Sequence, residues 1–164
     1  PLILYNVPSR TGLNISLDSY KILAQHPNIN GVKEASGNIS QVMHLLAACG
    51  DHFNVWSGND DEIVPMIAAG AQGVISVLAN VCPKETVALT DACFAGNYAA
   101  ARALQNRYME LIDALFCETN PIPAKTAMNM LGWDVGNLRM PLCDMEEKNA
   151  ARLRAALEGA GLLH

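Results

Sequence analysis

The sequence predicts an α/β protein: a parallel β-sheet with helices, followed by an all-helical C-terminal segment. Two observations carry this prediction. In the first half of the chain, four short apolar stretches alternate with segments of helical periodicity. Each stretch is apolar along its whole length, which is typical of strands in a parallel sheet that is covered on both faces. After Pro83 only helical patterns remain.

Four segments are predicted to be strands. They are Leu2–Asn6, a strand within Ile29–Asn38 that carries Lys33, Phe53–Ser57 and Gly73–Val77. Tyr5 and Lys33 are 28 positions apart, which fits one strand–helix–strand unit. Active sites of parallel α/β proteins lie at the carboxyl ends of the strands. The side chains near those ends are therefore candidate functional groups: Tyr5, Lys33, Ser57 and Ser76.

Helices are predicted between and after these strands. Ser16 is expected to cap a helix from Leu17 to Gln25. Apolar residues at i, i+3 and i+4 predict a helix that begins at Ile39 and is closed by Gly50. The remaining helices are predicted over residues 61–69, 84–94, 98–116, 123–131 and 146–157.

Composition narrows the class of protein. The 164 residues are 51% hydrophobic and 16% charged with a net charge of −5, which argues against a disordered chain and against a nucleic-acid-binding surface. The five cysteines are widely spaced without a C-x-x-C pair, which favours reduced thiols in a cytosolic protein over disulfides or zinc. The uncharged run 63–83 contains Pro65, Gly70 and Gly73, which favours buried core over a membrane helix.

The start of the chain raises a question about the sheet. The sequence begins with Pro1 and is already inside an apolar strand at Leu2. Four strands are too few for a closed (β/α)8 barrel, which typically needs about 200 residues or more. The residues alone leave two alternatives: an unusual open sheet, or a barrel whose first four strands precede Pro1.

Lys33 is the first candidate for chemistry. Burial disfavours the charged form of a lysine, and a neutral amine attacks a carbonyl to form a Schiff base. The alternative is a lysine at a strand end whose ammonium group reaches water, which is the commoner case for Lys33 considered alone.

Tyr5 and Arg10 belong to a second candidate stretch, which runs to Gly12. A phenol on the strand next to Lys33 would act as a proton relay, and the alternative is an ordinary core tyrosine. A guanidinium just beyond the strand end would hold a substrate carboxylate, and the alternative is an exposed loop arginine. No metal site is predicted, because the acidic run 58–62 is explained by the start of a helix.

Two motifs together resemble one family. Y-N-V-P-S-R-T-G at residues 5–12 and G-V-K-E-A-S-G-N at residues 31–38 resemble the dihydrodipicolinate synthase family, within the wider pyruvate-dependent class I aldolases that include N-acetylneuraminate lyase. S-G-N-D-D at 57–61, G-V-I-S-V-L-A-N at 73–80 and T-N-P-I-P-A-K at 119–125 also fit. The resemblance covers the whole chain and implies the second half of a (β/α)8 TIM barrel. Strands five to eight would lie in residues 1–82, and an all-helical C-terminal segment in residues 83–164.

The resemblance also implies roles for five residues. Lys33 would form the Schiff base with pyruvate, and Tyr5 would relay protons. Arg10 would bind the carboxylate of the aldehyde, aspartate semialdehyde. The backbone of Ile75 would contact pyruvate, and Gly58 would line the same pocket. Metal ligands are not part of this set.

The implied reaction is the condensation of pyruvate with L-aspartate 4-semialdehyde to 4-hydroxy-tetrahydrodipicolinate, in lysine and diaminopimelate biosynthesis. The enzyme would be a cytoplasmic lyase without a metal or organic cofactor, and a homodimer or homotetramer when complete. A sister aldolase acting on a sugar acid is an alternative that Arg10 argues against, and a non-catalytic α/β fragment is another. The family's threonine pair lies in the first half of the barrel, so the 164 residues alone are expected to be inactive.

Overall fold

The computed structural model describes residues 1–163 and divides the chain into two compact units. Unit 1 consists of Pro1–Ser76 with Cys93–Tyr98. Unit 2 consists of Val77–Ala92 with the described chain from Ala99 onward. All five site residues implied by the resemblance lie in unit 1, so that unit contains the whole candidate site.

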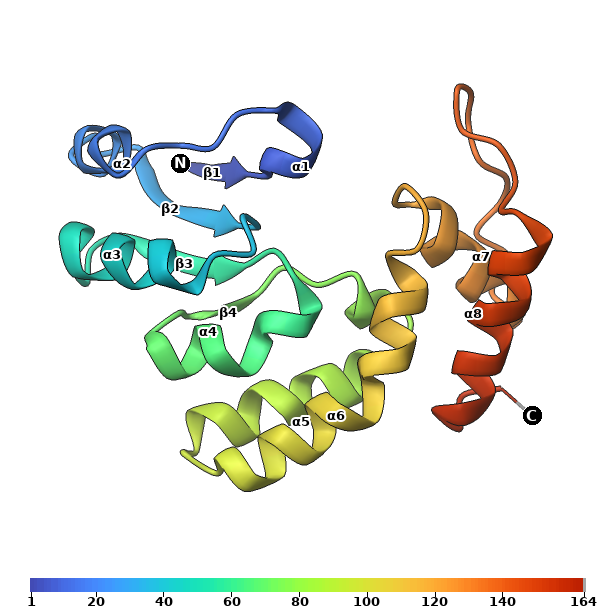
Figure 1. Ribbon diagram of the computed structural model, residues 1–164. Helices are drawn as coiled ribbons and strands as arrows, with labels where there is room; N and C mark the ends of the chain where they lie inside the picture. Colours follow the sequence, from blue (N-terminus) through green and yellow to red (C-terminus); the bar gives the residue numbers. More distant parts are fainter. Residues whose placement is uncertain (164) are drawn as a thin grey trace. The chain divides into compact units, whose positions relative to one another are not determined.

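A parallel four-stranded sheet forms the centre of unit 1. Its strands are β1 (Leu2–Asn6), β2 (Ile29–Glu34), β3 (Asn54–Ser57) and β4 (Gly73–Val74), in the order β1-β2-β3-β4. All three neighbouring pairs are parallel, which confirms the predicted sheet (Figure 1).

The fourth strand is shorter than predicted. It was expected over Gly73–Val77 but ends at Val74, because its partner β3 ends at Ser57, the residue paired with Val74. The amide of Ile75 still donates to the carbonyl of Ser57 (2.8 Å). Beyond it the chain turns into a short 3₁₀ helix, η2 (Leu78–Asn80).

Helices connect the strands of unit 1 at the predicted places. α2 (Leu17–Leu23) begins at Ser16, whose hydroxyl accepts a hydrogen bond from the amide of Ser19. α3 (Ile39–Cys49) is capped in the same way by Asn38, which accepts from the amide of Gln41. α4 (Ile63–Ala69) follows a 3₁₀ turn, η1 (Asp60–Glu62). Side-chain caps of this kind satisfy amides that have no partner within the helix.

A short helix that the sequence did not predict follows β1. α1 (Pro8–Thr11) has proline in its first turn and ends at Gly12, which has a φ of 70°. Proline suits the first turn of a helix and glycine the left-handed residue after it. Pro8 therefore begins this single helical turn, and Gly12 ends it. This helix carries Arg10 and buries none of its side chains.

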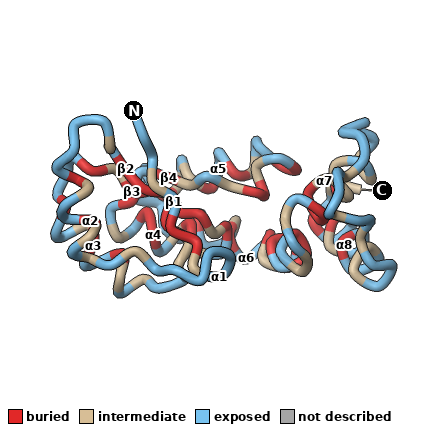
Figure 2. Tube along the Cα trace, turned by 90° about the horizontal axis from the view of Figure 1, so that it is seen from above, coloured by how far each residue is buried: buried red, intermediate tan, exposed pale blue. Residues whose placement is uncertain are grey.

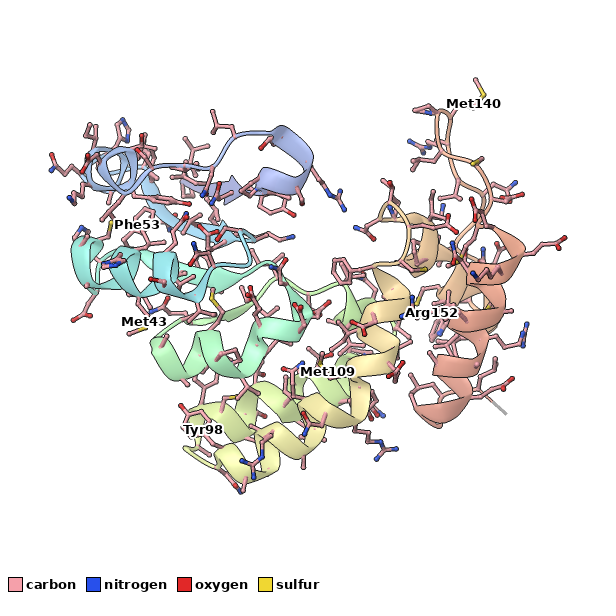
Figure 3. All side chains as sticks on the ribbon, viewed as in Figure 1. Met43, Phe53, Tyr98, Met109, Met140 and Arg152 are labelled. Carbon is pink, nitrogen blue, oxygen red and sulfur yellow. The ribbon has the colours of Figure 1, made fainter. Side chains whose placement is uncertain are left out.

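One face of the sheet packs against the helices. Successive side chains of a strand point to opposite faces, so Val32 of β2 and Val55 of β3 both lie on the helix side. Figure 2 shows buried residues concentrated along β2 and β3. The ring of Phe53 meets that of Tyr20 edge-on, with centroids 6.3 Å apart (Figure 3). The buried core of this unit is formed by Tyr20, Ala24, Val32, Val42, Leu45, Cys49, Phe53, Val55, Met66 and Ala71.

Most of the predicted helical segment lies in unit 2, while Cys93–Tyr98 within it belong to unit 1. The helices in this part of the chain are α5 (Pro83–Phe94), α6 (Tyr98–Leu115), α7 (Ile122–Met130) and α8 (Glu147–Gly159). The fully buried centre of the unit includes Ala114, Leu115, Ala127, Leu153 and Leu157. A loop between α7 and α8 carries Met140, which is 93% exposed (Figure 3). None of the helices within residues 1–163 is long and apolar enough to cross a membrane.

Candidate functional site

The register of the first two strands brings Tyr5 and Lys33 together. They are paired neighbours in β1 and β2, and both point to the face of the sheet opposite α2 and α3. The Nζ atom of Lys33 lies 4.4 Å from the centroid of the Tyr5 ring. This is within the range of a cation–π contact. The two side chains therefore lie side by side on one face of the sheet.

Both side chains remain accessible on this face. Lys33 is half-buried, and Tyr5 is 46% exposed. Within residues 1–163, neither the amine of Lys33 nor the hydroxyl of Tyr5 takes part in a hydrogen bond or ion pair to another residue. An amine without a bonded partner is available to a carbonyl carbon, and a phenol beside it is available for proton transfer.

Trp56 completes the row, and sequence reasoning missed it. It is the partner of Lys33 on the other side, in β3. A Cβ atom added to Gly31 would lie 2.6 Å from the Trp56 ring, so the ring occupies the space above a residue without a side chain. The sequence did contain a signal for it. Trp56 lies in the strand predicted to follow the Lys33 strand, and side chains alternate between the two faces of a sheet.

Gly58 gives the Lys33 side chain room at the end of β3. Its amide donates to the carbonyl of Glu34 (2.7 Å), which ties the end of β3 to the end of β2. A Cβ atom at Gly58 would lie 2.7 Å from Cβ of Ala35 and 3.2 Å from Cε of Lys33. The close approach therefore requires glycine and places Gly58 beside the amine's stem.

Arg10 lies in the loop directly after β1, as predicted. It is exposed in α1, and its guanidinium has no hydrogen-bond or ion-pair partner in the described part of the chain. Its backbone amide donates to the carbonyl of Val7 (2.9 Å). A guanidinium without an internal partner is able to hold a carboxylate through two parallel hydrogen bonds.

The remaining residues near strand ends differ in position. Ile75 directly follows β4 and is 39% exposed. The hydroxyl of Ser57 is buried on the helix side and donates to the carbonyl of Asn59 (2.7 Å), so it does not share the face of Lys33. Ser76 lies beyond the end of β4 rather than within a strand. The candidate site therefore does not include the Ser57 hydroxyl.

A buried carboxylate lies directly behind the site. Glu34 is 1% exposed and points to the helix side of β2. Its Oε2 accepts a hydrogen bond from the hydroxyl of Tyr20 (2.7 Å), and Asn6 donates to both of its oxygens. The pKa of Tyr20 is raised far above its usual value. Burial is the larger cause, and the hydrogen bond to this carboxylate is the second. Sequence reasoning did not single out Glu34, although an acid at an inward position of an apolar strand is a signal of a paired polar group.

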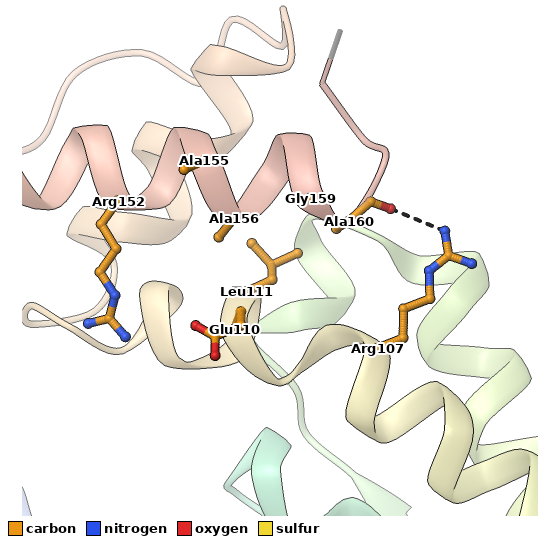
Figure 4. Close-up of a pocket in the computed structure, with 8 residues that line it drawn as sticks. All are labelled: Arg107, Glu110, Leu111, Arg152, Ala155, Ala156, Gly159 and Ala160. Atoms are coloured by element: carbon orange, nitrogen blue, oxygen red, sulfur yellow. Dashed lines mark hydrogen bonds between the residues drawn. The ribbon is translucent and has the colours of Figure 1, made fainter.

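A hollow in unit 2 is lined by residues other than those of the candidate site. It has a volume of about 360 Å³ and lies in unit 2 between α6 and α8 (Figure 4). Arg107 and Arg152 contribute to its lining, and Arg107 donates to the carbonyl of Ala160 (3.3 Å). None of the five implied site residues lines this hollow.

Curated relatives match almost the whole chain. A 4-hydroxy-tetrahydrodipicolinate synthase of Clostridium perfringens is 48% identical over 163 residues, which are 99% of this chain and 56% of that protein. The synthase of Methanococcus maripaludis is also 48% identical, over 164 residues and 56% of its length. The chain thus spans about half the length of the curated relatives it matches.

Solved structures have the same fold over this region. The dihydrodipicolinate synthase of Thermotoga maritima matches with a TM-score of 0.93 and 41% identity, covering 98% of this chain and 56% of that one. The enzyme from Acinetobacter baumannii, solved in complex with pyruvate, matches with a TM-score of 0.94 and 40% identity, covering 99% and 56%.

A comparison of the sequence with a protein-family model agrees with these relatives and structures. The model of the dihydrodipicolinate synthetase family matches residues 1–160. Together with relatives near 50% identity over nearly the whole chain, this match decides membership. The chain belongs to the dihydrodipicolinate synthetase family.

Proposed function

We propose that this chain supplies the second half of a (β/α)8 barrel, strands five to eight, in an enzyme that condenses pyruvate with L-aspartate 4-semialdehyde. The product would be 4-hydroxy-tetrahydrodipicolinate, a precursor in lysine and diaminopimelate biosynthesis. Residues 1–82 would carry the barrel strands, and residues 83–164 the helical segment. The observation that carries the proposal is the amine of Lys33 beside the Tyr5 ring on the open face of the sheet.

The order of the strands supports the half-barrel. A (β/α)8 barrel consists of consecutive parallel strands, each followed by a helix. Here four strands lie side by side in sequence order, and β1 and β4 are the edges of the described sheet. In a closed barrel both edges would pair with strands of the other half, and the face of Lys33 would become the barrel interior.

In the proposed reaction Lys33 is the nucleophile. Its neutral amine attacks the keto carbon of pyruvate, a C–N bond forms, and water leaves to give an imine. Loss of a proton from the methyl carbon gives an enamine, whose carbon attacks the aldehyde carbon and forms the new C–C bond. The imine accepts the electron pair, so this scheme requires no metal or organic cofactor. The amino group of the aldehyde substrate would then attack the imine carbon, close the ring and release the amine of Lys33. The Tyr5 hydroxyl would carry protons between these steps.

The other residues would hold the two substrates. Arg10 would grip the carboxylate of the aldehyde, since its guanidinium lies beyond the end of β1 without an internal partner. The amide of Ile75 already donates to Ser57, so its contact with pyruvate would be made through its carbonyl oxygen. Gly58 would form the wall next to the stem of Lys33. The pyruvate complex of the Acinetobacter baumannii relative supports pyruvate as one substrate.

The complete enzyme would be cytoplasmic and a homodimer or homotetramer. The scattered cysteines, none of which forms a disulfide in the described chain, suit a reducing compartment. One solved relative is described as the first monomeric variant of dihydrodipicolinate synthase, and it matches this chain with a TM-score of 0.93.

The test is to complete the barrel. Residues 1–164 are produced alone and as a fusion to the N-terminal part of the Clostridium perfringens relative that precedes its matching region. We expect consumption of pyruvate and aspartate semialdehyde by the fusion only, and its loss in a Lys33→Arg fusion. Full activity of the 164 residues alone would contradict the half-barrel. Activity that survives Lys33→Arg would contradict the assigned nucleophile.

A further inference from the structure

The loop that carries Arg10 has little packing of its own. It runs from Val7 to Asn14, and α1 within it buries no side chain. Among the described residues, the hydroxyl of Thr11 bonds only within the loop: it contacts the carbonyls of Val7 and Leu13 as donor and accepts from the amide of Leu13. Its position on the sheet must therefore be fixed mainly at its two ends.

Asn6 fastens both ends of this loop. It is the last residue of β1 and is 1% exposed. Its backbone carbonyl accepts from the amide of Ala35 (2.9 Å), which fixes the start of the loop to the end of β2. Its side-chain oxygen accepts from the amide of Ile15 (3.1 Å), and its Nδ2 donates to Oδ1 of Asn14 (2.8 Å), which fixes the far end.

Glu34 in turn holds the amide of Asn6. Nδ2 of Asn6 lies 3.0 and 3.1 Å from the two carboxylate oxygens of Glu34. The same carboxylate accepts from the amide of Ser36 (2.8 Å) and from the hydroxyl of Tyr20 (2.7 Å). No cationic side chain pairs with it among residues 1–163. Burying a carboxylate is costly unless its oxygens are hydrogen-bonded. Because the acceptor is charged, each of these bonds is stronger than a bond between neutral groups.

Glu34 and Lys33 are consecutive residues on opposite faces of one strand. Glu34 belongs to the same strand as Lys33, and its bond to Asn6 joins this strand to the base of the Arg10 loop. We infer that Glu34 is a positioning residue, which acts through Asn6 to hold the Arg10 loop in register with the strand that carries Lys33. The part of this inference that concerns substrates rests on the proposed function.

The first test is Glu34→Gln, which keeps the size of the side chain but turns one acceptor oxygen into a donor. That donor can face the hydroxyl of Tyr20, which then accepts, while the remaining oxygen still accepts from Asn6 and Ser36. The expected result is hydrogen exchange at the amide of Ile15 that is faster by ~5–10-fold, since a neutral oxygen holds the amide of Asn6 less strongly than a carboxylate does. Exchange is measured in the 164-residue chain and in the completed fusion. Unchanged exchange at Ile15 would overturn the inference.

The second test restores the hydrogen bond between positions 6 and 34 with donor and acceptor exchanged. In Asn6→Asp with Glu34→Gln, the amide of the new glutamine donates to the new carboxylate, which still accepts from Ile15. The side-chain amides of Asn14 and Gln41, which bond each other reciprocally, turn over together so that Asn14 donates to the new carboxylate. We expect slow exchange at Ile15 to return to within ~3-fold of the original chain. This double variant also decides the case in which Glu34→Gln alone does not fold. A double variant no better than the single one would contradict the role of the Glu34–Asn6 bond.

A matched control separates positioning from general support. Tyr20→Phe removes another bond to the same carboxylate but leaves the bonds of Asn6 to Asn14 and Ile15 in place. We expect lower stability without faster exchange at Ile15. An equal effect of Tyr20→Phe and Glu34→Gln on that amide would show that Glu34 only supports the fold.

Kinetics of the fusion provide the functional readout. Glu34→Gln is expected to raise KM for the aldehyde by ~10-fold, while trapping of the pyruvate imine on Lys33 changes by less than ~3-fold. An equal loss of both steps would overturn the positioning of Arg10. If the unchanged fusion forms no imine at all, the proposed function fails, and the exchange at Ile15 still decides whether Glu34 holds the loop.

Discussion

The amine nitrogen of Lys33 lies 4.4 Å from the centre of the Tyr5 ring, across one parallel strand pair. The contact joins two residues 28 positions apart and places the phenol ring beside the amine on which the imine would form. Tyr5→Phe keeps the ring and removes only the hydroxyl. In the completed barrel we expect imine formation to slow by ~10²–10⁴-fold, as for loss of a general acid–base group. Stopped-flow measurement of pyruvate binding checks this, and an unchanged rate would exclude Tyr5 from proton transfer.

Lys33 should be the single site of covalent modification. The other lysines are exposed or already bonded: Lys21 pairs with Asp18 at 3.0 Å, and Lys125 donates to the carbonyl of Asn137 at 2.6 Å. Pyruvate plus borohydride should therefore add one reduced adduct to the peptide that contains Lys33, as read by mass spectrometry. An adduct on Lys84 or Lys148 instead, or none in an active fusion, would contradict the Schiff-base mechanism.

Arg10→Ala should affect one substrate more than the other. The guanidinium has no internal partner to lose, so the fold should be unaffected. Loss of one charge-assisted pair weakens use of the aldehyde by about 1.5–3 kcal/mol, or roughly 10–150-fold in kcat/KM. Formation of the pyruvate imine should remain near its original rate. Arg10→Lys is the matched control, and equal loss of both steps would make Arg10 structural.

Gly58→Ala tests the close packing around the stem of Lys33. The added methyl would lie 2.7 Å from Cβ of Ala35, which lowers the free energy of unfolding by about 1–3 kcal/mol. Adding Ala35→Gly removes that clash and should recover most of the stability. The contact with Cε of Lys33 at 3.2 Å remains, so imine formation should stay slow in the double variant. Chemical denaturation and imine trapping separate the two effects.

Tyr20 should make the folded protein sensitive to alkali. Burial and the bond to Glu34 raise its pKa, so the folded state holds this proton after the unfolded state, with a pKa of about 10, has released it. The contribution is complete below pH 10 and is lost as pH rises above that value. Tyr20→Phe should be less stable at pH 7 but lose less stability between pH 9 and 11. Urea unfolding at several pH values measures both, and parallel pH curves would contradict the assignment.

The fold was largely predictable because its signals are local. The spacing between Tyr5 and Lys33 predicted one strand–helix–strand unit, which β1, α2 and β2 form, and Ser16 caps its helix as expected. The length of β4 was not predictable in this way, since it depends on where β3 ends. The network of Glu34 was missed for the same reason. Its donors come from residues 6, 20 and 36, and only the folded sheet brings them to one carboxylate.

The sequential order of the strands has a consequence for folding. Lys33 pairs with Tyr5 and Trp56, which are only 28 and 23 positions away in the chain. Each of these strands pairs with the strand made just before it, so the loops that close span 23–28 residues and cost less entropy than contacts across the whole chain. During synthesis each strand therefore finds its partner already made, and we expect the row Tyr5–Lys33–Trp56 to form before the fourth strand emerges. The contact order of unit 1 would make the lysine strand an early template to which later strands are added.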